Sequence, residues 1–303
     1  MDAEDLVALY LNAHQAAGRT EQTISWHRHS LTPFVAWLRV EGHSTDPTNW
    51  SAKLIREWIL YCQTRPAKRG TGTLSDSGVN SLIRSLKALC RWLAEEELVD
   101  RDPFQRVKVP RAPRLVKPSL SADEMAKVLA VARTGRNRYR DEAVLLFILD
   151  TGARASEVCA LRADAIDWSS GIARLYGKGR KERYVPFSTH TAKAMQRYQI
   201  REREAKAPEF FLSEERLPLT PSGLYQICKR ISTESEVHVA PHKLRHTFAI
   251  SYLGAGGNAF TLQKLLGHTT LHTTLTYVAM TTDDLVSEHR DHSPVDAMLR
   301  RKR

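Results

Sequence analysis

Five short motifs in the second half of the chain contain side chains suited to catalysis. They are "TGARASE" with Arg154, "GKGRKERYVP" with Lys178, "HKLRH" with His242 and Arg245, "LLGH" with His268, and "TLTYVAM" with Tyr277. Transfer at a phosphodiester adds negative charge to the non-bridging oxygens, which two arginines can hold without losing their own charge. A lysine can protonate the leaving alkoxide, and a phenol can attack if a base or nearby cations activate it. The set predicts phosphodiester transfer without a metal.

The setting of Tyr277 leaves two interpretations open. In a helix, Leu271, Leu275 and Val278 would form one apolar stripe, and Tyr277 would lie roughly 120° away from it. Five threonines between residues 269 and 276 suit a strand equally well, and there Leu275 and Tyr277 would share a face. Taken alone, a tyrosine here is more often a packing residue than a nucleophile.

Other catalytic chemistries find weaker support. His242 and His246 have the i, i+4 spacing of metalloprotease ligands, but Lys243 stands where that motif needs glutamate. Neither "GKGRK" nor "GAGG" has the spacing of a nucleotide-binding loop, and no carboxylate cluster indicates a two-metal site. We therefore expect neither a metal nor another cofactor.

Composition indicates a globular protein that binds a polyanion. The chain has 303 residues, 42% hydrophobic and 26% charged, enough for two domains, and no apolar run could span a bilayer. The start, "MDAEDLVALYLNAHQ", lacks the features of a signal peptide, so we expect a cytoplasmic protein without membrane contact. Four widely spaced cysteines predict buried free thiols.

The positive charge lies mainly in the later part of the chain. The net charge is +11; residues 1–109 hold 14 Lys and Arg against 13 Asp and Glu, and the remaining residues hold 31 against 21. Such an excess is typical of proteins that bind nucleic acid, although a solvated basic surface is the simpler alternative.

The first domain, residues 1–103, is predicted to be a bundle of four or five helices, because apolar residues recur there at helical spacing. Residues 104–120 are predicted to be an extended linker, rich in proline and basic residues and free of acidic ones. The linker either tracks a phosphate backbone or is simply solvated. Its candidate DNA contacts are Arg106, Lys108, Arg111 and Arg114.

The second domain, residues 121–303, is predicted to be mainly helical with a small antiparallel β-sheet, an α+β catalytic domain. "SADE" at Ser121 is a capping box, and "DEAVLLFILDTGARASEVCAL" predicts two helices around a turn. Short β-type runs in "DAIDWSSGIARLYGKGRKERYVPF" predict a three-stranded meander, and helices follow up to a basic tail, "LRRKR".

The five motifs, in this order, resemble those of the tyrosine recombinase (phage integrase) family, and the chain looks like a simple Xer-like member with two domains. The resemblance implies that Tyr277 attacks the scissile phosphate, forming a 3′-phosphotyrosyl link and releasing a 5′-hydroxyl. It also implies that Arg154 and Arg245 hold the non-bridging oxygens, with His268 as a further donor.

The same resemblance assigns the remaining roles. His242 would be the general base and Lys178, after the first glycine of its turn, the general acid. Glu157 would support the catalytic residues without contacting the DNA itself; alternatively, it would be a solvated surface residue. Lys181 and Arg183 would meet the DNA backbone.

For the whole molecule, the resemblance implies a C-shaped clamp around double-stranded DNA and four protomers on two sites, without ATP. The tetramer would be homomeric or shared with a related recombinase, and a directionality factor is possible. Dimer resolution, integration and transposition all remain open. The segment after Tyr277 would dock on a neighbouring protomer or on its own domain. Alternative functions are a DNA-binding accessory protein without catalysis and a type IB topoisomerase-like enzyme.

Overall fold

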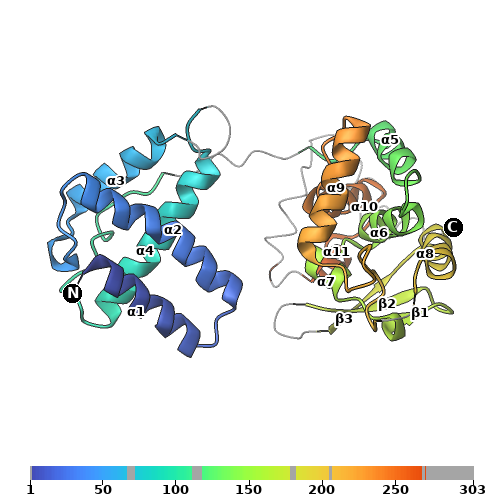
Figure 1. The fold of residues 1–303 in the computed structure, drawn as a ribbon, viewed down its shortest axis with the longest axis horizontal. Coiled ribbons are helices and arrows are strands. Elements are labelled where there is room, and N and C mark those ends of the chain that lie inside the picture. Colours follow the sequence, from blue (N-terminus) through green and yellow to red (C-terminus); the bar gives the residue numbers. More distant parts are fainter. Residues whose placement is uncertain are drawn as a thin grey trace, which may run out of the picture. The chain divides into compact units, whose positions relative to one another are not determined.

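The computed structural model describes residues 2–66, 72–110, 118–177, 182–204, 207–267 and residue 270. The chain divides into two compact units, Met1–Val116 and Lys117–Arg303. Figure 1 shows helices throughout both units and a small sheet in the second. In the described part of the chain, no helix is long and apolar enough to cross a membrane.

The first unit is a helical bundle, as predicted. Its helices are α1 (Ala3–Ala16), α2 (Glu21–Val40), α3 (Ala52–Thr64) and α4 (Asp76–Glu95). Each begins after a side chain that accepts a hydrogen bond from a backbone N–H of the first turn, which stabilises the helix start. These four capping residues are Asp2, Thr20, Ser51 and Ser75.

Large apolar side chains fill the centre of this bundle. Phe34 and Trp58 are fully buried, and their rings meet edge to face at 5.2 Å between centroids. Phe104 is also buried in this core, and Val107 and Val109 pack against it. The bundle therefore extends past the predicted boundary at 103, because apolar residues of the predicted linker have a core to cover.

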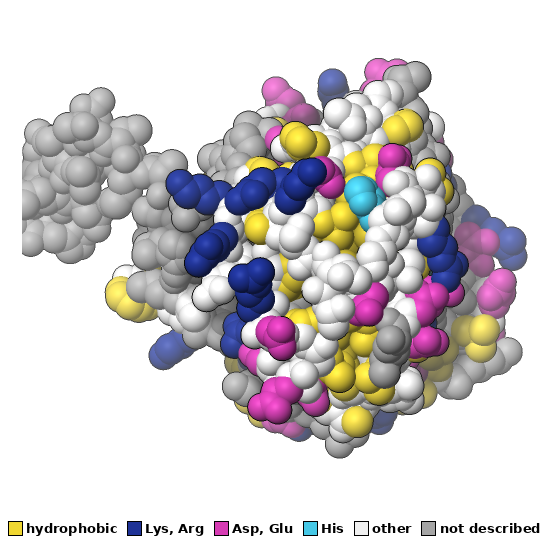
Figure 2. Space-filling view, turned by 90° about the vertical axis from the view of Figure 1, so that its left-hand side faces the viewer, with side chains coloured by type: hydrophobic (Ala, Val, Ile, Leu, Met, Phe, Trp, Pro, Cys, Tyr) yellow, Lys and Arg dark blue, Asp and Glu magenta, His cyan; other side chains and the backbone are white. Residues whose placement is uncertain are grey.

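Basic residues gather on α4. Between Asp76 and Glu95 this helix carries Arg84, Lys87 and Arg91, all exposed, and no acidic residue. On the face drawn in Figure 2, where single residues and helices are not labelled, lysine and arginine side chains also lie close together over one part. The total charge of residues 1–109 is nearly neutral, so it does not reveal that basic residues are concentrated on one helix.

The second unit combines helices with a three-stranded sheet, as predicted. Its helices are α5 (Ala122–Ala132), α6 (Arg138–Thr151), α7 (Ala155–Cys159), α8 (Thr189–Arg201), α9 (Pro221–Ser235), α10 (Pro241–Gly254) and α11 (Ala259–Leu266). The strands β1 (Ile166–Asp167), β2 (Ile172–Tyr176) and β3 (Glu182–Pro186) pair antiparallel in that order. The capping box at Ser121 is present, with Glu124 as its partner.

Helix α6 lies at the centre of this unit. It packs against α8 and α10, and Val144, Phe147 and Ile148 are fully buried. It ends at Gly152, whose φ of +61° is left-handed. A Cβ at Gly152 would lie 2.4 Å from Cδ1 of Phe248, so only glycine fits this turn. The turn leads directly into Arg154 and α7.

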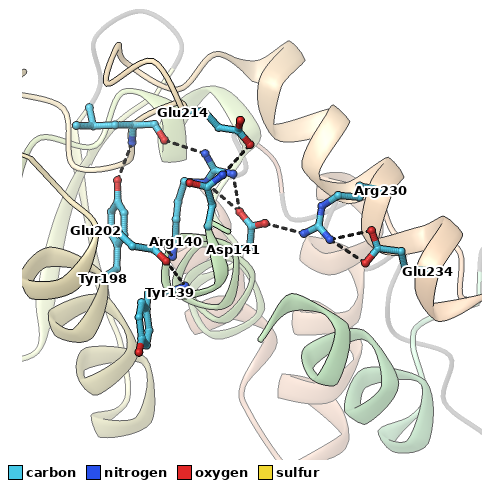
Figure 3. A network of polar contacts seen from close by, with 10 residues as sticks. Tyr139, Arg140, Asp141, Tyr198, Glu202, Glu214, Arg230 and Glu234 are labelled. Carbon is cyan, nitrogen blue, oxygen red and sulfur yellow. Dashed lines mark hydrogen bonds and ion pairs between the residues drawn. The ribbon is translucent and has the colours of Figure 1, made fainter. Parts of the chain in front are cut away.

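A buried polar network fixes the other end of α6 (Figure 3). Arg140 and Asp141 form an ion pair at 2.8 Å, and Asp141 also accepts from Arg230 of α9 at 2.7 Å. The carboxylate of Glu202 accepts hydrogen bonds from the backbone N–H groups of Tyr139 and Arg140, and so caps α6. These charges are paired, as buried charges must be. The network holds α6, and with it the turn at Gly152, in place.

All four cysteines are free and buried, as predicted. Burial raises the pKa of the Cys62, Cys159 and Cys228 thiols to about 12. These thiols are therefore packing residues and not nucleophiles.

Candidate active site

Arg154 lies where the chain enters α7, directly after the turn at Gly152. Its backbone N–H donates to Oε2 of Glu157 at 2.7 Å, and its Nη1 donates to Oε1 of the same carboxylate at 2.9 Å. Its Nη2 donates to the carbonyl oxygen of Gly267 at 3.2 Å. The side chain is 40% exposed. Glu157 and Gly267 therefore fix the backbone and the guanidinium of Arg154, and the remaining N–H donors of the guanidinium can reach a ligand.

Glu157 is the anchor of this arrangement. Its side chain is only 1% exposed, and besides Arg154 it accepts from Nη1 and Nη2 of Arg183 in β3, at 2.5 and 2.8 Å. Its position three residues after Arg154 lets the carboxylate reach back to the helix start. A buried carboxylate is tolerated here because two guanidinium groups pair with it.

Arg245 approaches the same turn from α10. It is 4% exposed, and its Nη1 donates to the carbonyl oxygen of Gly152 at 2.5 Å. Its Nη2 donates to the carbonyl oxygen of Leu266 at 2.8 Å. Leu266 and Gly267 are consecutive, so the two arginines predicted to hold the phosphate both bind the end of α11.

His242 is exposed in the first turn of α10, three residues before Arg245. Residues three apart on a helix share a face. The same helix therefore carries His242 and Arg245 on one side, although Arg245 is buried and His242 reaches the surface.

Several predicted site residues lie outside the described part of the chain. They are Lys178, Lys181, His268, Tyr277, Arg111 and Arg114. The described residues that precede two of these positions are placed: strand β2 ends at Tyr176, two residues before Lys178, and Gly267, directly before His268, lies against Arg154 and Arg183. Arg106 and Lys108 are described, and both are exposed in the first unit.

The position of Arg183 does not match its predicted role as a contact to the DNA backbone. Its side chain is 11% exposed and both of its terminal nitrogens point to Glu157, not outward to a DNA backbone. Burial lowers the pKa of its guanidinium, with a smaller lowering from nearby Arg154. The sequence predicted the turn at Gly152 but gave neither Gly152 nor Gly267 a role in the site. Both have left-handed φ angles; Gly152 lies against Phe248 and Leu266, and Gly267 lies against Arg183 and Arg154.

Comparison with known proteins shows to which family the chain belongs. Residues 118–283 match the phage integrase family. The chain is 34% identical over 284 residues to the tyrosine recombinase XerC of Oceanobacillus iheyensis, covering 90% of each chain. It is 28% identical over 285 residues to the tyrosine recombinase XerC of Bacillus subtilis, covering 91% of each.

Solved structures share the fold. One is the Tn1549 transposon integrase in complex with a circular intermediate DNA, with a TM-score of 0.77 and 21% identity over 97% of this chain and all of that chain. Another is a lambda integrase dimer bound to a core site, with a TM-score of 0.72 and 16% identity over 91% of this chain and 95% of that chain.

The chain therefore belongs to the phage integrase family, as its motifs predicted. Within this family it is an Xer-like tyrosine recombinase, an enzyme of site-specific recombination that cleaves and rejoins DNA strands.

Proposed function

We propose that Tyr277 attacks the scissile phosphate while Arg154 and Arg245 hold its non-bridging oxygens. The observation that carries this proposal is the binding of both arginines to consecutive carbonyls, those of Gly267 and Leu266. That point of the chain directly precedes His268 and lies ten residues before Tyr277. Two fixed guanidinium groups beside it would bind a phosphate more strongly as its negative charge grows in the transition state.

Three further residues complete the proposed chemistry. His242, exposed on the helix that carries Arg245, would take the phenol proton of Tyr277. Lys178 would protonate the leaving 5′-oxygen, and His268 would add a donor to the phosphate. The tyrosyl ester keeps the free energy of the broken phosphodiester, so strands can be rejoined without ATP. The arginines supply the positive charge, so the reaction is proposed to need no metal.

The DNA-contacting surface of the first unit is proposed to include the α4 patch, which we define as Arg84, Lys87 and Arg91. Arg84 and Lys87 make no ion pair with any described residue, whereas Arg91 pairs with Glu95. Unpaired exposed cations are available to phosphates. Together with the predicted contacts at Arg106, Lys108, Arg111 and Arg114, this patch would bind the phosphate backbone of a duplex.

The similarity to proteins named XerC over 90% of the chain supports resolution of chromosome or plasmid dimers as the biological role. Integration or transposition is less well supported, because the transposon integrase is similar in fold alone. Recombination between two sites would use four protomers, either identical or shared with a related recombinase, and a directionality factor could bias the outcome. We place the reaction in the cytoplasm, where the chain would act on DNA.

A nicked suicide substrate tests the proposed nucleophile. DNA selected from a random pool would provide the binding site, and a nick next to the scissile phosphate would trap the covalent adduct. The unaltered chain should form an adduct that Tyr277→Phe abolishes while DNA binding persists. An adduct that persists in Tyr277→Phe would disprove the nucleophile, and tight binding without any adduct would favour an accessory protein.

A further inference from the structure

Arg183 lies on the core side of the sheet. It pairs in register with Leu175 of β2, which is 1% exposed, and shares its face with buried Val185. Its neighbours Glu182 and Tyr184 point to the opposite, exposed face. Side chains alternate along a strand, so the register of β3 turns Arg183 inward.

The guanidinium of Arg183 completes the coordination of Glu157. Each carboxylate oxygen accepts two hydrogen bonds: Oε1 from Nη1 of Arg154 and Nη1 of Arg183, Oε2 from the backbone N–H of Arg154 and Nη2 of Arg183. Each oxygen has two lone pairs, so the acceptor capacity is filled. The three side chains together carry one net positive charge.

We propose that Arg183 is a positioning residue for DNA cleavage, which neutralises Glu157 and thereby leaves the charge of Arg154 available to the scissile phosphate. This rests on the proposed function of Arg154. Without Arg183, Glu157 would have Arg154 as its remaining ion-pair partner among the described residues. Arg154 would then be drawn toward two-point contact with the carboxylate, and the pair would carry no net charge.

Arg183 also supports the segment that Arg154 binds. A Cβ at Gly267 would lie 3.0 Å from Nη1 and 3.2 Å from Cδ of Arg183, so the two residues are in close contact. The carbonyl of Gly267 accepts from Arg154. One side chain therefore determines both the charge around Arg154 and the position of its carbonyl partner.

Burial of this arginine is otherwise hard to explain. Its Nε is buried and has no hydrogen-bond partner in the described part of the chain. An unpaired buried donor costs stability. Its two terminal nitrogens donate to Glu157 on the core side of the sheet. Both facts favour a role inside the site over a role in binding DNA.

The test compares Arg183→Met with Arg174→Met. Arg174 lies on β2, on the opposite face of the sheet, and makes no contact with Glu157. With saturating suicide substrate, Arg183→Met should form the adduct roughly tenfold to 100-fold more slowly, as found when residues that orient an active site are removed. Arg174→Met should retain the normal rate. The salt dependence of DNA binding should be unchanged in Arg183→Met.

A double variant separates charge neutralisation from general support. If Arg183 acts by neutralising Glu157, then Glu157→Gln combined with Arg183→Met should cleave faster than Arg183→Met alone. If Arg183 merely supported the fold, the second substitution would add damage. Should Arg183→Met fail to fold, Arg183→Lys replaces it. This variant keeps the charge but loses the two-point contact with Glu157, so it should cleave more slowly than the unaltered chain while the salt dependence of DNA binding is unchanged.

The outcomes that overturn the proposal are distinct from failure of the proposed function. A normal cleavage rate in Arg183→Met would refute the positioning role. A salt slope whose magnitude falls by about 0.9, as expected for a lost phosphate contact, would make Arg183 a DNA contact after all. No gain from Glu157→Gln would refute charge neutralisation. Absence of an adduct in the unaltered chain would instead refute the function on which the inference rests.

Discussion

Arg154 and Arg245 donate hydrogen bonds to the carbonyl oxygens of two consecutive residues, Gly267 and Leu266. Arg154 comes from the start of α7 and Arg245 from α10, so the end of α11 joins the two helices. The arginines differ in their exposure: the side chain of Arg154 is 40% exposed, whereas Arg245 is 4% exposed. The same residue type therefore has a larger structural role at 245 than at 154.

Lysine substitutions should separate these roles. Arg245→Lys leaves at least one buried carbonyl without its donor, so we expect a loss of about 2 kcal/mol in the free energy of unfolding, whereas Arg154→Lys should lose less than about 1 kcal/mol. Both variants should form the covalent adduct at least about 100-fold more slowly, because lysine cannot hold a phosphate bidentately. Thermal unfolding and the suicide-substrate assay measure the two effects. Equal losses of stability in the two variants would contradict the larger structural role of Arg245.

Gly152→Ala should damage the site through its backbone. Alanine would have to adopt the left-handed conformation and would meet Phe248 at 2.4 Å. We expect a loss of about 2 kcal/mol or more in stability, a fall in Tm of roughly 5 °C, and loss of adduct formation. Gly254→Ala is the matched control, because no atom lies within 4 Å of a Cβ there and its φ is not left-handed. A normal Tm in Gly152→Ala would show that the turn can relax.

The sequence predicted element types better than side-chain directions. The three-stranded meander, the capping box at Ser121 and the helical bundle were all accessible from periodicity and turn residues. Arg183 was assigned to DNA because it stands in a basic motif, yet the alternation with Val185 already placed it on the core side. The approach of Arg245 to Gly152 joins residues 93 positions apart, and no local pattern encodes such a contact.

The α4 patch should contribute to DNA affinity. Arg84→Ala and Lys87→Ala should each weaken binding and lower the slope of log K against log salt by roughly 0.9, because each removes one phosphate contact. Lys53→Ala on α3 is the control; its ammonium is exposed but lies within 3.9 Å of Glu57. Binding titrations over a range of salt concentrations measure the slope. An unchanged slope in both α4 variants would place the DNA on another face of this unit.

We expect His27 to make the stability of the first unit sensitive to acid. It is 5% exposed on α2, where its Nδ1 lies 2.9 Å from the hydroxyl of Ser85 on α4 and its ring stacks on His14 of α1. Tyr10 faces it at 3.5 Å. Burial lowers the pKa of His27 to about 4, with a smaller lowering from His14. Among the described residues, the ring contacts Tyr10, Ser85, His14 and Trp26 and no carboxylate, so a proton on His27 would be a poorly compensated buried charge.

The direction of the pH effect follows from this lowered pKa. Because the unfolded state takes up the proton near pH 6.5, the contribution of neutral His27 is fully present above that pH and is lost as the pH falls toward 4, by up to about 3 kcal/mol. Tryptophan fluorescence during denaturation reports mainly on this unit, because five of the six tryptophans precede residue 100. His27→Gln, which keeps a polar side chain without titrating, should unfold with a weaker pH dependence between 6.5 and 4. If both proteins lose stability equally over this range, His27 is not the group that responds, and His14, whose pKa burial also lowers, or the carboxylates of the first unit would account for the loss.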